Sequence, residues 1–186
     1  MFVTRQSKNL QRVLTSAKVN SPNLVQTPKF EQGAGSYKCQ GCHACKVVQN
    51  TKYFKSTNTK KKYFIRQKIS CRSSYIIYLI VYSNCQGNYV GKSKREFRQR
   101  HSGHKQEIGN RQGGLGQHFN SHNGQGCSYD HLKATLIEKV ENGNDSQLSE
   151  RELYWQYQLR TFKENGGNGM NLKDDLHLKI YININI

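Results

Sequence analysis

Two expected helices carry charged side chains within their apolar stripes, and these side chains could do chemistry. The first stripe falls at helical spacing and comprises Phe97, Arg100 or His101, His104 and Ile108. An arginine that faces a sheet is costly unless it meets an anion. Arg100 therefore indicates an anion-binding site. In the alternative, Arg100 reaches solvent and His104 is a hydrogen-bonded histidine of the core.

A carboxylate interrupts the second stripe, which lies on the last expected helix: Leu148, Glu152, Trp155, Leu159 and Phe162. A carboxylate that points inward needs a cation, either a side chain or a metal ion. Glu152 is therefore a candidate metal ligand or one half of an internal Glu–Arg ion pair. The neighbouring Glu150 and Arg151 are expected to be solvated.

Two tyrosines lie on an expected β-hairpin. Residues 75–82 are aromatic and β-branched, which predicts a strand buried on at least one face. Turn-forming residues 83–88 follow, and 89–91 begin the returning strand. Cross-strand packing is the ordinary explanation for a pair such as Tyr78 and Tyr89. Their convergence with the two charged stripes on one sheet face indicates an active site.

The cysteines and two of the histidines form two groups with the spacing of metal ligands. The first group offers four thiols that could bind a tetrahedral zinc: Cys39, Cys42, Cys45 and Cys71. In the alternative, these thiols are free or partly buried and bind no metal. In the second, one helical turn places two histidines on one side: Cys85, His118, His122 and Cys127. No secretory signal is evident, so a reducing compartment is expected and metal binding is preferred to disulfides.

The chain divides into segments of different composition. Residues 1–36 read as a polar linker with a short helix, and 37–72 as a Cys-rich basic segment. Residues 73–172 form the patterned domain and 173–186 a tail. In this tail, alternation at 180–186 predicts an added edge strand or an exposed adhesive segment.

Helices and strands alternate within the patterned domain after the hairpin. Ser93 and Glu96 read as a capping box, which starts a helix that lasts to about residue 110. A short helix at 115–121, a strand at 132–136 and a final helix at 145–162 follow. The order β-β-α-α-β-α predicts an α/β or α+β domain around a small antiparallel or mixed sheet.

Charge indicates the class of partner. Lysine and arginine number 29 against 12 acidic residues, which gives a net charge of +17. Such a surplus favours polyanions, first nucleic acid and second an anionic membrane surface. No apolar run reaches the roughly 18–20 residues that a membrane span needs. DNA is therefore the expected partner, with no membrane association.

In order along the chain, these residues resemble the motifs of GIY-YIG endonucleases. The matching elements are Ile76-Ile77-Tyr78, with isoleucine for the usual first glycine, Tyr89-Val90-Gly91, the helix with Arg100 and His104, Glu152, and Gly169-Met170-Asn171. The resemblance is strongest to the endonuclease region of Penelope-like retroelements. These also carry a Lys-Asn-Leu-like helix and a cysteine cluster ahead of the nuclease, as do residues 8–10 and 39–42 here.

The resemblance implies a three-stranded, mainly antiparallel sheet flanked by helices, and hydrolysis of a phosphodiester. Glu152 would hold Mg²⁺ or Mn²⁺, which would act as a Lewis acid on the scissile phosphate. The residues that would act on water and phosphate are Tyr78, Tyr89, Lys92, Arg100 and His104. The resemblance leaves open whether Tyr78, Tyr89 or a histidine orients or deprotonates the water, and Tyr78 is the first choice. Positive charge from Arg100 and Lys92 would lower the pKa of its phenol.

The resemblance also bears on the second ligand group. Penelope-like nucleases place two cysteines between the half-motifs and pair them with two histidines. Here Tyr82 occupies the first cysteine position. Either Cys127 replaces that ligand or the zinc site is lost.

The leading interpretation is an active DNA nickase from a retroelement protein. Its nick would expose a primer for reverse transcription, with element RNA and a reverse-transcriptase domain as further partners. A nuclear location is expected, with cytoplasm as the second choice, and a monomer or weak dimer. The alternatives are a catalytically inactive nucleic-acid-binding module and a free-standing repair or homing nuclease.

Overall fold

The structure is a computed structural model that describes residues 30–121, 129–163 and 168–172. Several predictions concern residues outside these ranges: the N-terminal helix, the ligand candidates His122 and Cys127, and the alternating tail 180–186. No helix among the described residues is long and apolar enough to span a membrane.

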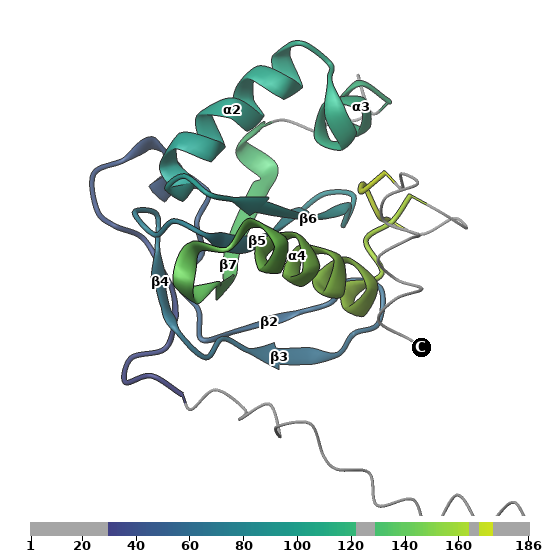
Figure 1. Cartoon of the computed structure of the whole chain (residues 1–186). Helices are drawn as coiled ribbons and strands as arrows, with labels where there is room; N and C mark the ends of the chain where they lie inside the picture. Colours follow the sequence, from purple (N-terminus) through teal and green to yellow (C-terminus); the bar gives the residue numbers. More distant parts are fainter. Residues whose placement is uncertain (1–29, 122–128, 164–167, 173–186) are drawn as a thin grey trace, which may run out of the picture.

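A three-stranded antiparallel sheet forms the centre of the fold, in the order β6-β5-β7 (Figure 1). Its strands are β5 (Ile76–Tyr82), β6 (Asn88–Ser93) and β7 (Leu132–Lys139). The near-continuous apolar run of β5 places it in the middle, where six of its seven residues are buried. The predicted small antiparallel sheet is confirmed.

Among the described residues, three helices flank this sheet (Figure 1). Helices α2 (Phe97–Gly109) and α3 (Gly113–Ser121) lie together on one side, and α4 (Asp145–Leu159) lies on the other side and packs against β6. Short 3-10 turns at Tyr129–His131 and Glu141–Gly143 flank β7. The predicted order of two strands, two helices, strand and helix is therefore confirmed.

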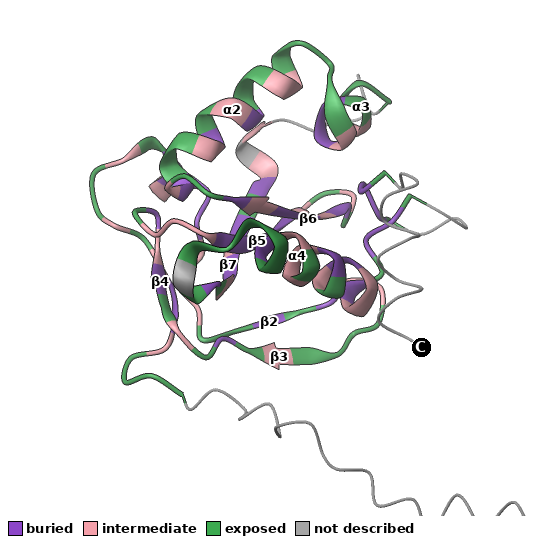
Figure 2. Ribbon diagram, in the orientation of Figure 1, coloured by how far each residue is buried: buried purple, intermediate pink, exposed green. Residues whose placement is uncertain are grey.

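The segment before the hairpin folds onto this body. It contains β1 (Gly35–Tyr37) paired in parallel with β4 (Lys68–Ser70), and an antiparallel ribbon of β2 (Tyr53–Lys55) and β3 (Lys62–Phe64). A 3-10 turn, η1 (His43–Lys46), carries part of the cysteine group. Figure 2 shows buried residues in β4 as well as in the central sheet. The cysteine-rich segment thus packs against the patterned domain.

Two predicted helix boundaries are wrong. Residues 93–96 do not form a capping box, because β6 continues through Ser93, which pairs with Ile76. Helix α2 begins at Phe97, and the Glu96 carboxylate instead pairs with Arg98. The last helix ends at Leu159 rather than at about residue 162, because Arg160 adopts a left-handed conformation with φ 53°.

Arg151 corrects a further prediction, since it is not simply solvated. Its guanidinium forms a two-pronged ion pair with Glu138 of β7, at 2.7 and 2.8 Å. The indole of Trp155 donates a hydrogen bond to the same carboxylate. Helix α4 is therefore fixed to β7 by polar as well as apolar contacts.

Candidate active site and metal ligands

The hydroxyl group of Tyr78 is the centre of a buried polar cluster. Tyr78 lies in the middle of β5 and is fully buried. Its oxygen accepts a hydrogen bond from Arg100 Nε at 3.2 Å and lies 2.6 Å from His104 Nε2. Arg100 and His104 are four residues apart on α2, so both reach the same point of the sheet. The polar stripe predicted on this helix thus meets the predicted tyrosine.

Gly91 provides the space for this cluster. It lies directly opposite Tyr78 in the β5–β6 register. A Cβ at Gly91 would lie 2.5 Å from the Tyr78 hydroxyl oxygen and 2.7 Å from a ring carbon of Tyr89. Any larger residue would displace the tyrosine hydroxyl. Gly91 is therefore required here for close approach rather than for turn geometry.

Glu107 is a member of this cluster that sequence reasoning missed. One of its carboxylate oxygens accepts a hydrogen bond from Arg100 Nη1 at 2.8 Å, and the other lies 2.8 Å from His104 Nδ1. The spacing of Arg100, His104 and Glu107 places all three on one helix face, and this was the signal available in the sequence. Glu107 orients both of the side chains that contact Tyr78.

The protonation of this chain of groups follows from its surroundings. The hydrogen bond from His104, with help from Arg100, lowers the pKa of Glu107 to about 2, so the carboxylate is ionised near neutrality. Burial lowers the pKa of His104 and favours a neutral ring. A neutral ring that donates from Nδ1 to Glu107 leaves Nε2 as an acceptor. The Tyr78 hydroxyl can therefore donate its proton toward His104.

Neither tyrosine is a strong acid in this environment. Burial raises the pKa of Tyr78 well above its usual value, and it raises the pKa of Tyr89 to about 12. The positive charge of Arg100 opposes both shifts without overcoming them. The charge of Arg100 alone therefore does not bring the pKa of either phenol toward neutrality in this arrangement. His104 is the group placed to accept the proton instead.

Glu152 lies on α4, and its negative charge contributes to raising the pKa of both tyrosines. Its side chain is 13% exposed, and its carboxylate lies 3.0 Å from the ammonium group of Lys92. Lys92 also donates a hydrogen bond to Ser149 at 2.8 Å. The inward carboxylate therefore has a cationic partner, which is a lysine rather than the arginine that was considered. Lys92 was expected to supply positive charge to Tyr78. In the structure its ammonium group forms an ion pair with Glu152 instead.

The donors around Glu152 fit a magnesium ion that keeps most of its water. Mg²⁺ commonly binds proteins through one or two carboxylates, together with waters and substrate phosphates. Glu152 supplies one such carboxylate, partly buried and beside the tyrosine cluster. Within the described part of the chain, the only gathering of three or more metal-ligand side chains is the cysteine group. A divalent ion at Glu152 would therefore depend on substrate oxygens.

Asn171 holds the strand that carries Tyr89. Its buried side chain accepts a hydrogen bond from Val90 N at 2.9 Å and donates one to Val90 O at 2.7 Å. In the part of the chain that the structure describes, β6 is an edge strand, and these bonds satisfy the backbone groups of Val90 on its outer edge. Asn171 therefore fixes the backbone between Tyr89 and Gly91.

Asn171→Asp is expected to lower the free energy of unfolding by about 1–3 kcal/mol, because a carboxylate cannot donate to Val90 O. Urea denaturation at pH 7 measures this loss. Asn168→Asp is the matched control, since the Asn168 side chain is exposed. Equal stability of the two variants would show that the paired bonds to Val90 contribute nothing.

The structure gathers the first cysteine group into a compact tetrad. Its Sγ atoms, those of Cys39, Cys42, Cys45 and Cys71, all lie within 4.8 Å of one another. The separations from Cys45 are 3.7 Å to Cys39, 3.6 Å to Cys42 and 3.8 Å to Cys71. A disulfide needs about 2 Å. A tetrahedral zinc with bonds of ~2.3 Å places its sulfurs roughly 3.8 Å apart, so the tetrad fits zinc.

The second ligand group is only partly described. Cys85 Sγ lies 3.2 Å from His118 Nε2, so the structure brings these two predicted ligands together. Tyr82, in the position where a cysteine was expected, places its ring 5.4 Å from that of His118. The remaining candidates, His122 and Cys127, lie outside the described residues.

His101 gives a pH dependence of folding that can be tested. It is buried on α2 and hydrogen-bonded to the Tyr129 hydroxyl. Burial lowers the pKa of His101 from 6.5 to about 4, with smaller electrostatic contributions from the neighbouring His104, His43 and Lys105. The unfolded chain therefore binds the extra proton first as the pH falls. The stability linked to His101 is complete above about pH 6.5 and is lost toward pH 4.

We expect acidification from pH 7 to pH 4.5 to cost on the order of 1–2 kcal/mol through His101. Urea denaturation at a series of pH values measures this slope. His101→Gln should flatten it, since glutamine carries no titratable proton. A slope unchanged by the substitution would assign the acid sensitivity to other groups.

Comparisons with known proteins gave one structural match. No protein-family model matches the chain, and no curated protein matches it. The catalytic domain of the homing endonuclease I-TevI is similar in structure, with a TM-score of 0.41 and 22% sequence identity. The match covers 53% of this chain and 97% of that domain.

Proposed function

We propose that this chain is a metal-dependent endonuclease of the GIY-YIG type that nicks DNA. The observation that carries the proposal is the Tyr78 hydroxyl, which is hydrogen-bonded to Arg100 and lies against His104, with Glu107 behind both. Binding DNA requires none of these buried contacts, since surface lysines and arginines suffice. Hydrolysis of a phosphodiester requires a proton acceptor beside a cation, and this cluster provides both.

Each side chain has a definite task in this proposal. Arg100 holds the phosphoryl oxygens and stabilises a developing phenolate at Tyr78. His104, oriented by Glu107, accepts the Tyr78 proton so that the tyrosine can take one from water. Tyr89 positions the water. Mg²⁺ or Mn²⁺ on Glu152 would supply Lewis-acid stabilisation of the leaving oxygen.

Lys92 has a role that the sequence did not suggest. Its ammonium balances the charge of Glu152 at 3.0 Å. A divalent ion on Glu152 would repel this ammonium and free it to contact a DNA phosphate. Lys92 is therefore placed beside both the Glu152 carboxylate and the expected position of the DNA phosphate.

We further infer that the nick serves a retroelement of the Penelope-like class, where it primes reverse transcription on target DNA. The order of motifs and the cysteine tetrad ahead of the sheet support this assignment, as does the net charge of +17. Element RNA and a reverse-transcriptase domain would be the further partners, and the nucleus the site of action. Zinc bound by the tetrad would be a structural cofactor.

Nicking of supercoiled plasmid tests the proposed activity. Wild-type protein with Mg²⁺ or Mn²⁺ should convert supercoiled to open-circular DNA, and Glu152→Gln and Arg100→Ala should not, although both should still bind DNA. Arg98→Ala is the matched control, because Arg98 lies on the same helix and its side chain is exposed. Absence of nicking by the wild type, or equal nicking by all variants, would contradict the proposal.

Two observations favour a second function, a nucleic-acid-binding module without catalysis. The Glu152 carboxylate is already neutralised by Lys92, and Tyr78 is fully buried. In such a module, Mg²⁺ would leave both DNA integrity and DNA affinity unchanged, and the plasmid assay distinguishes the two functions.

A further inference from the structure

The β2–β3 ribbon has two chemically different faces. The inner face carries Phe54 and Tyr63, whose stacked rings each lie 5.4 Å from Trp155 of α4. The outer face carries two cross-strand pairs, Tyr53 with Phe64 and Lys55 with Lys62. The inner face therefore anchors the ribbon, and the outer face is available to a partner. We call the four outer residues the ribbon surface.

The ribbon surface combines exposed aromatic rings with cations. Phe64 is 56% exposed and Tyr53 is 41% exposed, although burying such rings is favourable. The ammonium of Lys62 lies 3.9 Å from the centre of the Tyr53 ring and 4.8 Å from that of Phe64. Exposed rings held in place by a neighbouring lysine are ready to stack on another flat ring.

The charge around this surface is entirely positive along the chain. No aspartate or glutamate occurs between residues 32 and 95. The stretch 52–68 instead holds seven cationic residues: Lys52, Lys55, Lys60, Lys61, Lys62, Arg66 and Lys68. A partner must therefore be anionic and must also offer surfaces that stack. Duplex DNA hides the faces of its bases, and a membrane has no flat rings, so single-stranded nucleic acid fits best.

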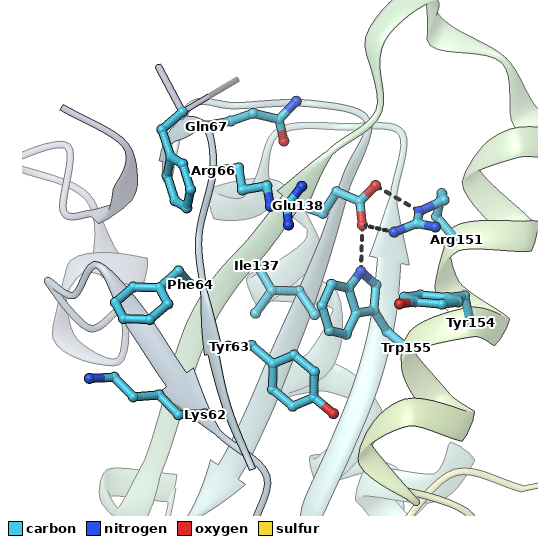
Figure 3. Close-up of a pocket in the computed structure, with 11 residues that line it drawn as sticks. Lys62, Tyr63, Phe64, Arg66, Gln67, Ile137, Glu138, Arg151, Tyr154 and Trp155 are labelled. Atoms are coloured by element: carbon cyan, nitrogen blue, oxygen red, sulfur yellow. Dashed lines mark hydrogen bonds and ion pairs between the residues drawn. The ribbon is translucent and has the colours of Figure 1, made fainter. Parts of the chain in front are cut away.

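A pocket of about 410 Å³ opens beside the ribbon, between β3 and α4 (Figure 3). In Figure 3, Lys62 and Phe64 lie on the β3 side, and Arg151 and Tyr154 on the α4 side. The carboxylate of Glu138 also lines the pocket and on its own would repel an anion. Its charge is balanced by the ion pair with Arg151, and it accepts a hydrogen bond from the Trp155 indole. Ligand pockets span roughly 300–1,000 Å³, so this one can accept a nucleobase.

We propose that the ribbon surface and this pocket form a binding site for single-stranded nucleic acid. Bases stack on Tyr53 and Phe64, and one base enters the pocket against Tyr63. Lys62 and Arg66, which both line the pocket, pair with the flanking phosphates. The site lies across α4 from the helix that carries Arg100 (Figure 1), so it is spatially separate from the Tyr78 cluster. It would hold a displaced strand or an RNA beside the duplex that is cut.

Fluorescence anisotropy without added Mg²⁺ or Mn²⁺ tests the site independently of catalysis. The probes are a labelled 20-nucleotide oligo(dT) and a labelled 20-base-pair duplex. Tyr53→Ala combined with Phe64→Leu is expected to raise the Kd for oligo(dT) by about 10- to 100-fold, because each stacked base contributes substantially. Duplex affinity should change less than threefold. Thermal unfolding verifies that the variant is folded.

A second variant separates charge from stacking and guards against a folding defect. Lys62→Gln should weaken oligo(dT) binding and reduce its salt dependence. Lys105→Gln on α2 removes the same charge elsewhere and should leave oligo(dT) binding unchanged. An unchanged oligo(dT) affinity in the ribbon variants overturns the proposal, as does an equal loss for both probes. Binding to phosphatidylserine vesicles through Tyr53 and Phe64, without oligo(dT) binding, would overturn it in favour of a membrane.

Discussion

Tyr78→Phe is expected to slow plasmid nicking by about 10²–10⁴-fold, the usual contribution of a positioned proton-transfer group. The substitution removes one oxygen and keeps the ring, whose centre lies 5.1 Å from that of Phe97. Both Arg100 Nε and His104 Nε2 lose the partner that they have in the wild type. The loss therefore falls on chemistry, with an accompanying stability cost of about 1–3 kcal/mol.

Single-turnover nicking measured across a range of pH gives the diagnostic result. Burial raises the pKa of Tyr78, so the phenol does not finish titrating in the neutral range. The wild-type nicking rate should therefore keep rising with pH across this range. Tyr78→Phe should be slow and nearly independent of pH. Tyr75→Phe is the matched control, since it removes the same atom from the residue immediately before β5. A Tyr78→Phe variant within threefold of the wild type would exclude the hydroxyl from the reaction.

Glu107→Gln distinguishes orientation from proton transfer in the same assay. Glutamine keeps the length of the side chain, but its neutral amide has only one acceptor oxygen. It can no longer accept hydrogen bonds from Arg100 and His104 with two separate, negatively charged oxygens. The rate should fall less than in Tyr78→Phe, and the pH dependence should shift because His104 loses its anionic neighbour. A rate and pH profile identical to the wild type would leave Glu107 with a structural role only.

Periodicity predicted the central fold well, because its elements are long. The apolar run of β5 and the stripe of α4 each extend over many residues, so one misplaced side chain does not hide the pattern. The strands β1 to β4 have three residues each. A three-residue strand shows no recognisable period, and β1 pairs with β4 across about thirty residues of intervening chain. Such pairing depends on tertiary contacts that no local pattern contains.

The failure at Ser93 shows how tertiary structure overrides a local signal. A serine three residues before a glutamate is typical of a helix start. At this position, Ser93 pairs with Ile76 as the last residue of β6. The ladder bonds of the sheet hold the backbone extended, and the helix can start only four residues later. The capping preference is worth about 1 kcal/mol, less than the pairing that it would interrupt.

The site was predicted by residue type where a polar group interrupted an apolar pattern. Arg100, His104 and Glu152 were found in this way, since each stands in a stripe that should be apolar. Glu107 was missed because a carboxylate late in a helix usually faces solvent. Asn171 was recognised only as part of a motif, because its contact with Val90 spans 81 residues.

Loss of metal from the cysteine tetrad should have the largest effect on folding. A chelator that strips the tetrad, or Cys71→Ser, is expected to lower the free energy of unfolding by several kcal/mol, since structural zinc contributes about 10–16 kcal/mol in zinc-finger peptides. Three of the ligands lie in the segment 39–45, and Cys71 follows β4. One ion would therefore join two segments that are far apart in sequence.

The same tetrad is connected to the active site through the backbone. Arg98 N donates to Cys71 O at 3.0 Å, and Phe97 N donates to Ser73 O at 3.2 Å, so the first turn of α2 is anchored beside the tetrad. Arg100 lies in this turn. Metal loss is therefore expected to reduce nicking as well as stability, through displacement of Arg100 from Tyr78.

Metal analysis and thermal unfolding of the same sample test this coupling. Wild-type protein should contain close to one zinc per chain, and Cys71→Ser should contain markedly less and unfold at a lower temperature. Ser102→Ala on α2 is the control, because Ser102 is exposed and lies outside both groups of candidate metal ligands. Zinc added back to chelated wild type should restore both stability and nicking. A wild type free of zinc, or a Cys71→Ser variant with unchanged metal content and stability, would contradict the zinc assignment.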